Sequence, residues 1–266
     1  MQRAIEQELA ASGGRSACIV LRLNESGPEG LVCINPDMVF PAASLAKVPI
    51  LVEVARQVDL GILSWGTRYT VPETAHVTSS GVITDLSAEL RPTLHDLAHL
   101  MITISDNTAA NMLLYLVGME AVNTTMQQVG LTSTHLERRF MDFAARKSGR
   151  ENWTTPGDMA LIFSYLCSEL LPERERMLNM LLRQNDHTML SGYWGEDIPF
   201  AHKTGKLEGV LHDAGILYPP LPSGSAHTPH TPLIVIVMTA DQTDEPLTRY
   251  TLARIGGIIY NEYCTL

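Results

Sequence analysis

Long apolar runs, aromatic residues and positive charges are all scarce in this chain of 266 residues. The longest apolar run, at 233–238, has the length of a strand and falls far short of the roughly 18 residues that a membrane-spanning helix requires. Lysine and arginine number 19 against 29 acidic residues, so the net charge is −10 with histidine neutral. Phosphate backbones and anionic lipid repel such a chain, and we therefore expect neither nucleic-acid nor membrane partners.

Cysteine is also rare, and the four cysteines are scattered without a CxxC pair: Cys18, Cys33, Cys167 and Cys264. Cys18 and Cys33 lie inside apolar runs, where a free thiol behaves as a small hydrophobe, so we expect buried thiols rather than disulfides or zinc ligands. The first residues lack the basic head and apolar stretch of a signal peptide. We therefore expect a cytoplasmic protein, or a periplasmic or secreted one if a leader has been removed.

Apolar residues nevertheless make up 45% of the chain, which is ample for a buried core in one domain or two closely joined lobes. Strand-like runs at 17–23 and 31–34 flank a turn rich in Gly and Pro and predict a hairpin. Further runs at 200–205, 213–218 and 232–240 predict strands near the other end. Strands at both ends with helices between them indicate a sheet completed by both termini, which is an α+β fold.

Helix-start signals occur between these strands. Thr93 and Asp96 have the spacing of a capping box and predict a helix that runs to about Thr103. Thr155 followed by Pro156 predicts a second start, with proline in the first helical position. Apolar periodicity predicts further helices, which span 49–58, 107–117, 120–129 and 251–263.

Three short motifs carry the residues that could do chemistry: SxxK at 44–47, SDN at 105–107 and KTG at 203–205. A serine hydroxyl is a weak nucleophile at neutral pH and needs an adjacent base. Lys47 lies one helical turn after Ser44 on the same face, and desolvation would lower its pKa so that it could accept the serine proton. Taken singly, each motif has a plainer interpretation, as a helix cap, a solvated charge or a polar loop.

The ordered triple resembles the signature of class A β-lactamases and penicillin-binding proteins, and the resemblance covers most of the chain. It implies a serine hydrolase that forms an acyl-enzyme on Ser44, with Lys47 as the base. The implied fold is an antiparallel sheet flanked by helices, packed on an all-helical lobe. We place the sheet lobe at 1–43 and 188–266 and the helical lobe, with an active-site loop, at 44–187, in one compact unit.

The resemblance also implies roles for the other motif residues. Ser105 would relay the proton towards the leaving nitrogen, and the backbone N–H groups of Ser44 and Lys206 would form an oxyanion hole. This chemistry requires no metal and no organic cofactor. The residues expected to hold the amide and the carboxylate of a substrate are Asn107, Lys203, Thr204 and Gly205.

One departure from the family concerns deacylation, because class A enzymes carry a glutamate that activates the deacylating water. Aligning residues 136–138 with the Leu-Asp-Arg pattern of the family places Arg139 and Phe140 where Trp-Glu is expected. Asp142 is the nearest carboxylate and could substitute for the glutamate or merely brace the loop, and we expect Glu137 to pair with an arginine of the loop. The sequence thus predicts an acyl-enzyme that forms readily and is released slowly.

A second departure follows KTG, where 206–213 is longer than the usual strand connection. It places His212 near the position of an arginine that often binds the substrate carboxylate, so His212 is a candidate binding residue. Strand alternation directs His202 and Lys203 to opposite faces, which favours a packed His202.

Other functions remain open at this point. His95 and His99 have the spacing of a zinc helix, but Asp96 fits a capping box and a third ligand is not evident. A penicillin-binding protein that acylates without turnover and a D-alanyl carboxypeptidase would use the same motifs. We expect a monomer that acts on a small molecule, either a β-lactam, an ester or a D-amino-acid peptide.

Overall fold

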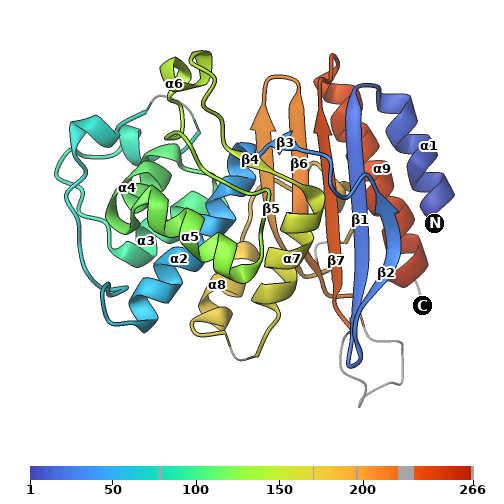
Figure 1. The fold of residues 1–266 in the computed structure, drawn as a ribbon, viewed down its shortest axis with the longest axis horizontal. Helices are drawn as coiled ribbons and strands as arrows, with labels where there is room; N and C mark the ends of the chain where they lie inside the picture. Colours follow the sequence, from blue (N-terminus) through green and yellow to red (C-terminus); the bar gives the residue numbers. More distant parts are fainter. Residues whose placement is uncertain (78–79, 170, 196, 221–230, 265–266) are drawn as a thin grey trace.

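The computed structural model describes residues 1–266 apart from 78–79, 170, 196, 221–230 and 265–266 (Figure 1). Its main sheet is antiparallel and has the strand order β2-β1-β7-β6-β5. The strands are β1 (Arg15–Asn24), β2 (Gly27–Ile34), β5 (Phe200–Leu207), β6 (Val210–Leu217) and β7 (Leu233–Ala240). Because β1 pairs with β7, the two ends of the chain complete one sheet, and the α+β prediction is confirmed.

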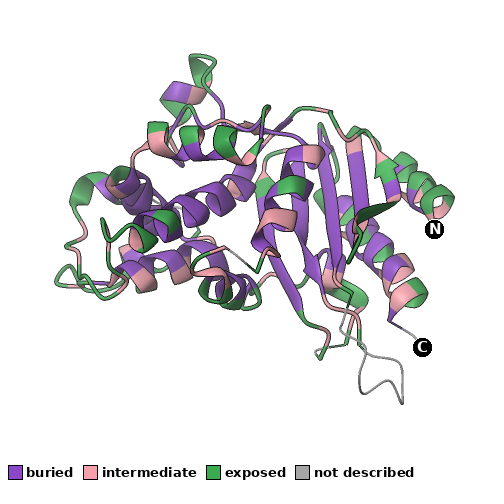
Figure 2. Cartoon of the chain, turned by 60° about the horizontal axis from the view of Figure 1, so that its bottom comes forward, coloured by how far each residue is buried: buried purple, intermediate pink, exposed green. Residues whose placement is uncertain are grey.

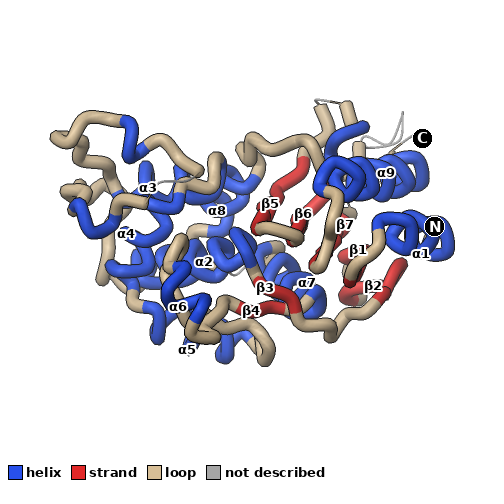
Figure 3. The backbone as a smooth tube through the Cα atoms, turned by 90° about the horizontal axis from the view of Figure 1, so that it is seen from above, coloured by secondary structure: helices blue, strands red, loops and turns tan. Residues whose placement is uncertain are grey.

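Two helices cover one face of this sheet, α1 (Gln2–Ser12) and α9 (Glu245–Tyr263). In Figure 3 the strands lie between this pair and α7 (Pro156–Leu166), which packs on β7, β1 and β6. Ile5 and Leu9 of α1 are buried with alternate residues of the strands, as the amphipathic pattern requires.

The remaining helices gather beyond β5 (Figure 1). In their centre α2 (Lys47–Asp59) is buried on nearly all sides, which suits its apolar sequence (Figure 2). Around it lie α3 (Leu94–Thr103), α4 (Asn107–Val117), α5 (Met119–Val129) and α8 (Arg174–Leu181), whereas α6 (Phe143–Lys147) lies apart at the top of Figure 1. Two short strands form a separate pair, β3 (Phe40–Pro41) and β4 (Trp153–Thr154). Short 3₁₀ turns complete the described elements: η1 (Ala43–Ala46), η2 (Glu73–Ala75), η3 (Ile83–Asp85) and η4 (Leu190–Tyr193).

The helix-start signals are confirmed in detail. Thr93 and Asp96 form a reciprocal capping box on α3, and Thr155 caps α7 with Pro156 in its first turn. The final helix begins earlier than predicted, at Glu245, because Asp244 caps it and a proline occupies its first turn. No helix in the described part of the chain is long and apolar enough to cross a membrane.

Two local predictions are wrong. Cys33 is exposed, because it lies on β2, the edge strand, although Cys18 is buried as expected. The connection after KTG is not long: Leu207 pairs with Val210, so β5 and β6 form a tight hairpin. The apolar residues that follow the turn continue the ladder, and they carry His212 into the middle of β6.

Candidate active site

The three sequence motifs meet at one pocket between the helices and the edge of the sheet. Ser44 lies in η1, which runs directly into α2, and Ser105 lies in the loop between α3 and α4. KTG lies in β5, the edge strand that packs against η1. The pocket has a volume of about 810 Å³. Among the residues that line it are Ser44, Ser105, Asn107 and Thr204.

Side-chain hydrogen bonds join the first two motifs. The Oγ atoms of Ser105 and Ser44 lie 2.9 Å apart, and Lys47 Nζ lies 2.8 Å from Ser105 Oγ. Lys47 Nζ also donates to the carbonyl of Ser105 and to Asn107 Oδ1, each at 2.7 Å. A continuous path for a proton therefore runs from the Ser44 hydroxyl through Ser105 to the Lys47 amine.

The surroundings of Lys47 favour its neutral form. Burial lowers the pKa of Lys47 well below its usual value, the charge of Lys203 lowers it further, and Asp106 acts in the opposite direction. Lys47 Nζ lies 4.9 Å from the centre of the Phe140 ring, a neighbour that stabilises a charge far less than a carboxylate does. An uncharged lysine can act as a general base, so the site supplies what a serine hydroxyl needs.

Asp106, the middle residue of SDN, shapes the loop. Its buried carboxylate accepts hydrogen bonds from the backbone N–H groups of Val82, Ile83 and Ala109, the last of which lies in the first turn of α4. A Cβ at Gly81 would clash with this carboxylate. A glycine is therefore required where the chain closes over SDN.

Three residues that line the pocket have the left-handed backbone that residues other than glycine rarely adopt: Ala43 with φ 47°, Ser105 with φ 59° and Met141 with φ 64°. Ala43 directly precedes Ser44, and a Cβ at Gly205 would lie 3.3 Å from the Ala43 Cβ. Gly205 thus lets β5 approach η1 closely. Strained backbone held by its surroundings is common at functional sites.

The KTG lysine is the second buried amine. Lys203 is fully buried, and its Nζ donates to the carbonyl of Thr204 at 2.8 Å. Burial lowers the pKa of Lys203 to about 7, although Asp213 and Asp186 act to raise it. Its charge is therefore present below about pH 7 and is lost as the pH rises through that value.

Comparison with known proteins identifies the family of this chain. Residues 1–263 match the profile of the Beta-lactamase enzyme family. The chain belongs to this family. A β-lactamase of Streptomyces fradiae is 31% identical over 210 residues, which cover 74% of this chain and 67% of that protein. A β-lactamase of Streptomyces albus G is 28% identical over 248 residues, which cover 88% and 74%.

Solved structures of other proteins have the same fold. A β-lactamase from Sphaerobacter thermophilus DSM 20745 superposes with a TM-score of 0.85 at 31% identity, over 98% of this chain and 96% of that chain. PBP-A superposes with a TM-score of 0.84 at 25% identity, over 98% and 94%. A mutant of PBP-A, with the same score and identity over 98% and 95%, was solved as an acyl-enzyme complex with penicillin G.

Phe140 is the residue that the sequence comparison above predicts at the position of the family glutamate. The Asn111 side chain accepts a hydrogen bond from the Phe140 N–H at 2.9 Å and donates to its carbonyl at 3.1 Å. These bonds fix the backbone, and the ring lines the pocket beside Lys47. At this position the pocket therefore presents an aromatic ring to Lys47 rather than a carboxylate.

The nearby carboxylate of Asp142 is engaged elsewhere. Its Oδ1 accepts a hydrogen bond from the Ala145 N–H at 2.9 Å and caps α6. Its neighbours Met141 and Phe143 are among the residues that line the pocket. This placement favours the bracing interpretation of Asp142.

The predicted pairing of Glu137 with an arginine is wrong. Glu137 lies 3.4 Å from His135 Nε2 and accepts a hydrogen bond from the Glu151 N–H. The loop arginines Arg138 and Arg146 bind Glu151 instead, at 2.6 Å and 3.0 Å. Glu151 is the buried carboxylate of the loop, and an ion pair is screened less there.

His212 is fully buried behind η1. Its Nε2 lies 2.8 Å from the carbonyl of Pro41 and therefore carries the proton, whereas its Nδ1 lies 3.2 Å from the Thr239 N–H and 2.9 Å from the Leu211 carbonyl. Burial lowers the pKa of His212 to about 4, which keeps the ring neutral. This placement supports the chain segment before Ser44 and does not favour contact with a substrate carboxylate. His202, as expected, is packed, with its Nδ1 2.7 Å from Asp213.

Sequence reasoning missed Ser80. Its hydroxyl donates to the Ser105 carbonyl at 3.0 Å and accepts a hydrogen bond from Asn107 Nδ2 at 3.2 Å, so it ties both ends of SDN. A serine in a polar loop gives no sequence signal for such a role. The zinc alternative gains no support, because in the described residues no group of three His, Cys, Asp or Glu side chains forms around His95 and His99.

Proposed function

We propose that this chain is a serine hydrolase that forms an acyl-enzyme on Ser44 with β-lactams or small esters and amides, and that releases it slowly. The observation that carries the proposal is the hydrogen-bonded path from Ser44 through Ser105 to a desolvated Lys47, beside Phe140. Membership of the β-lactamase family supports it.

Acylation begins with neutral Lys47. The hydroxyls then turn so that Ser44 donates to Ser105 and Ser105 donates to Lys47 Nζ. As Ser44 Oγ bonds to the carbonyl carbon of the substrate, its proton passes to Ser105, whose own proton passes to Lys47. When the tetrahedral intermediate collapses, the same path returns a proton to the leaving nitrogen or oxygen, and the acyl group stays on Ser44.

The edge of β5 supplies the rest of the site in this proposal. In an edge strand, half of the backbone N–H and C=O groups point away from the neighbouring strand. In β5 these groups are on the side of η1. We assign the oxyanion hole to the N–H groups of Ser44 and Lys206, with Asn107 on the substrate amide and Lys203 and Thr204 on a carboxylate. The side chain of Lys206 is held by Glu245 at 2.7 Å, outside this role.

Deacylation is the slow half. A water molecule must lose a proton to attack the ester, and Phe140 offers none of the basicity of a carboxylate. PBP-A, which this chain resembles across its length, favours the related candidate function of a penicillin-binding protein or D-alanyl carboxypeptidase. The two candidates share the acylation step and differ in the fate of the adduct.

Intact mass spectrometry after mixing with penicillin G tests the acylation step. We expect a mass increase equal to one whole penicillin, located on the peptide that contains Ser44. The Ser44→Ala protein should show no adduct. A persistent adduct on the alanine variant would assign the nucleophile elsewhere, and the lack of both an adduct and hydrolysed penicillin with the unmodified protein would exclude penicillin as an acyl donor.

The rate of acylation should depend on pH differently for charged and for neutral donors. Because Lys203 loses its charge as the pH rises through about 7, kcat/KM for penicillin G should fall several-fold between about pH 7 and 9. The methyl ester of penicillin G has no carboxylate to attract, so its rate should not fall over this range. Parallel profiles for the two compounds would contradict the role of Lys203.

A further inference from the structure

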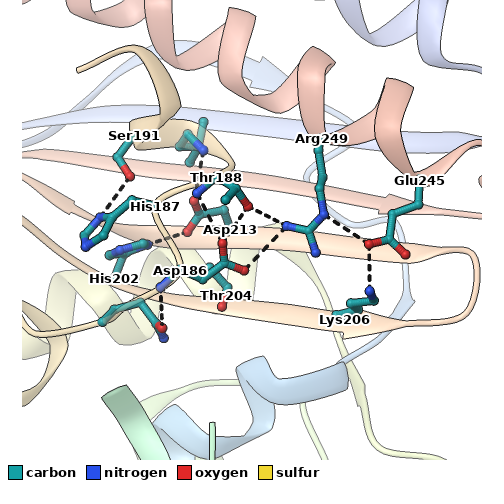
Figure 4. A network of polar contacts seen from close by, with 12 residues as sticks. Asp186, His187, Thr188, Ser191, His202, Thr204, Lys206, Asp213, Glu245 and Arg249 are labelled. Carbon is teal, nitrogen blue, oxygen red and sulfur yellow. Dashed lines mark hydrogen bonds and ion pairs between the residues drawn. The ribbon is translucent and has the colours of Figure 1, made fainter. Parts of the chain in front are cut away.

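A carboxylate of the chain itself lies on the pocket wall beside KTG. Asp186 lines the pocket together with Thr204, and both residues are labelled in Figure 4. The segment that carries Asp186 is fixed on both sides. The Asn185 N–H donates to the carbonyl of Thr103 at the end of α3, and the Leu190 N–H donates to Asp213 on β6.

Asp186 is held in its ionised form. Its Oδ1 accepts hydrogen bonds from the hydroxyl of Thr188 at 2.6 Å and from the N–H of the same residue at 3.2 Å. Arg249 of α9 lies 3.5 Å from its Oδ2. Burial opposes ionisation, but these bonds and the arginine outweigh it and hold the pKa of Asp186 below its usual value. The side chain is nevertheless 32% exposed, so its charge reaches the pocket.

Negative charges of the chain already act on each cation near this wall. The charge of Asp186, together with that of Asp213, favours the protonated form of Lys203. Arg249 lies between Asp186 and Glu245, which is 3.1 Å from its Nε (Figure 4). Glu245 also holds the ammonium group of Lys206. An incoming carboxylate would therefore compete with Asp186 for Lys203 and would meet a like charge beside Thr204.

We propose that Asp186 is a specificity-determining residue that disfavours acyl donors with a carboxylate at Thr204 and favours neutral esters and amides. This inference rests on the proposed acylation of Ser44. The negative charge of Asp186 repels substrates that carry a carboxylate, and such repulsion of unwanted substrates is a common source of specificity.

The test compares penicillin G with its methyl ester, which differ by one charge. Acylation rates are measured by intact mass at about pH 5.5, where Lys203 carries its proton, and are expressed as the ratio of acid to ester. In Asp186→Asn we expect this ratio to rise about tenfold, because a like charge is removed beside the carboxylate. Asp186→Glu keeps the charge, so its ratio should stay near that of the unmodified protein.

Glu208→Gln is the matched control, since Glu208 also lines the pocket but is not among the charges that shift the pKa of Lys203. We expect it to change the ratio less than twofold. An unchanged ratio in Asp186→Asn, or an equal rise in Asp186→Glu or Glu208→Gln, would overturn the specificity role alone. Failure of both probes to label Ser44 would overturn the proposed function and this inference with it.

Discussion

Replacing Lys47 with glutamine is expected to slow acylation of Ser44 by about 10³-fold, the usual contribution of a general base. Glutamine is one bond shorter than lysine and keeps a polar group on the side of Ser105 and Asn107, but its amide cannot accept the serine proton. The acylation rate with penicillin G, followed by intact mass, measures the effect. Loss of less than about tenfold would show that the proton leaves Ser44 by another path.

The thermal midpoint of the same variant separates chemistry from folding. Lys47 is fully buried, and its desolvation is unfavourable for the folded state. We therefore expect the glutamine variant to have a Tm equal to that of the original protein or above it. A gain in stability with a loss of activity is typical of a residue kept for function. A Tm lowered by more than about 10 °C would mean that the slower acylation reflects a damaged fold.

Replacing Phe140 with glutamate should accelerate deacylation, the second half of the reaction. The new carboxylate would lie in the pocket beside Lys47, because the Asn111 bonds hold the backbone in place. Such a group can take a proton from the attacking water, so we expect the acyl-enzyme to break down at least 10²-fold faster. The decay of the penicillin adduct after removal of excess drug measures this rate.

Phe140→Gln is the matched control for Phe140→Glu, since the glutamine side chain is as large as that of glutamate and is polar, but it is not a base. Its adduct should decay as slowly as that of the original protein. The glutamate variant should also acylate with a pH optimum shifted upwards, because an adjacent negative charge raises the pKa of Lys47. Equal acceleration by glutamine and glutamate would show that access of water, and not a missing base, limits deacylation.

Much of the fold could be predicted because its signals are local. The capping box at Thr93 and the proline after Thr155 mark helix starts through contacts within one turn. The interleaving of both termini follows from where the strand-like runs lie. The exposure of Cys33 could not be predicted, because it depends on which strand lies at the edge of the sheet.

In the site, too, features with local sequence signals could be predicted and features that depend on remote contacts could not. Its motifs are contiguous in sequence, and their spacing brought Ser44, Lys47 and Ser105 to attention before their distances were known. Ser80 and Asp186 act through contacts with segments remote in sequence, so no local pattern reveals them. The position of His212 depends on the hairpin after KTG. Because the turn is tight, His212 lies within β6 and its ring contacts the carbonyl of Pro41 rather than the pocket.

The central claim is that Ser44 is acylated quickly and released slowly, and the lifetime of one adduct tests it most directly. Penicillin G is added in small excess, unreacted drug is removed, and the intact mass is followed for hours. The account predicts an adduct of one whole penicillin that forms on Ser44 and remains on most molecules for many minutes or longer. Steady release of hydrolysed penicillin with no adduct at any time would contradict it, because the protein would then possess a deacylating base.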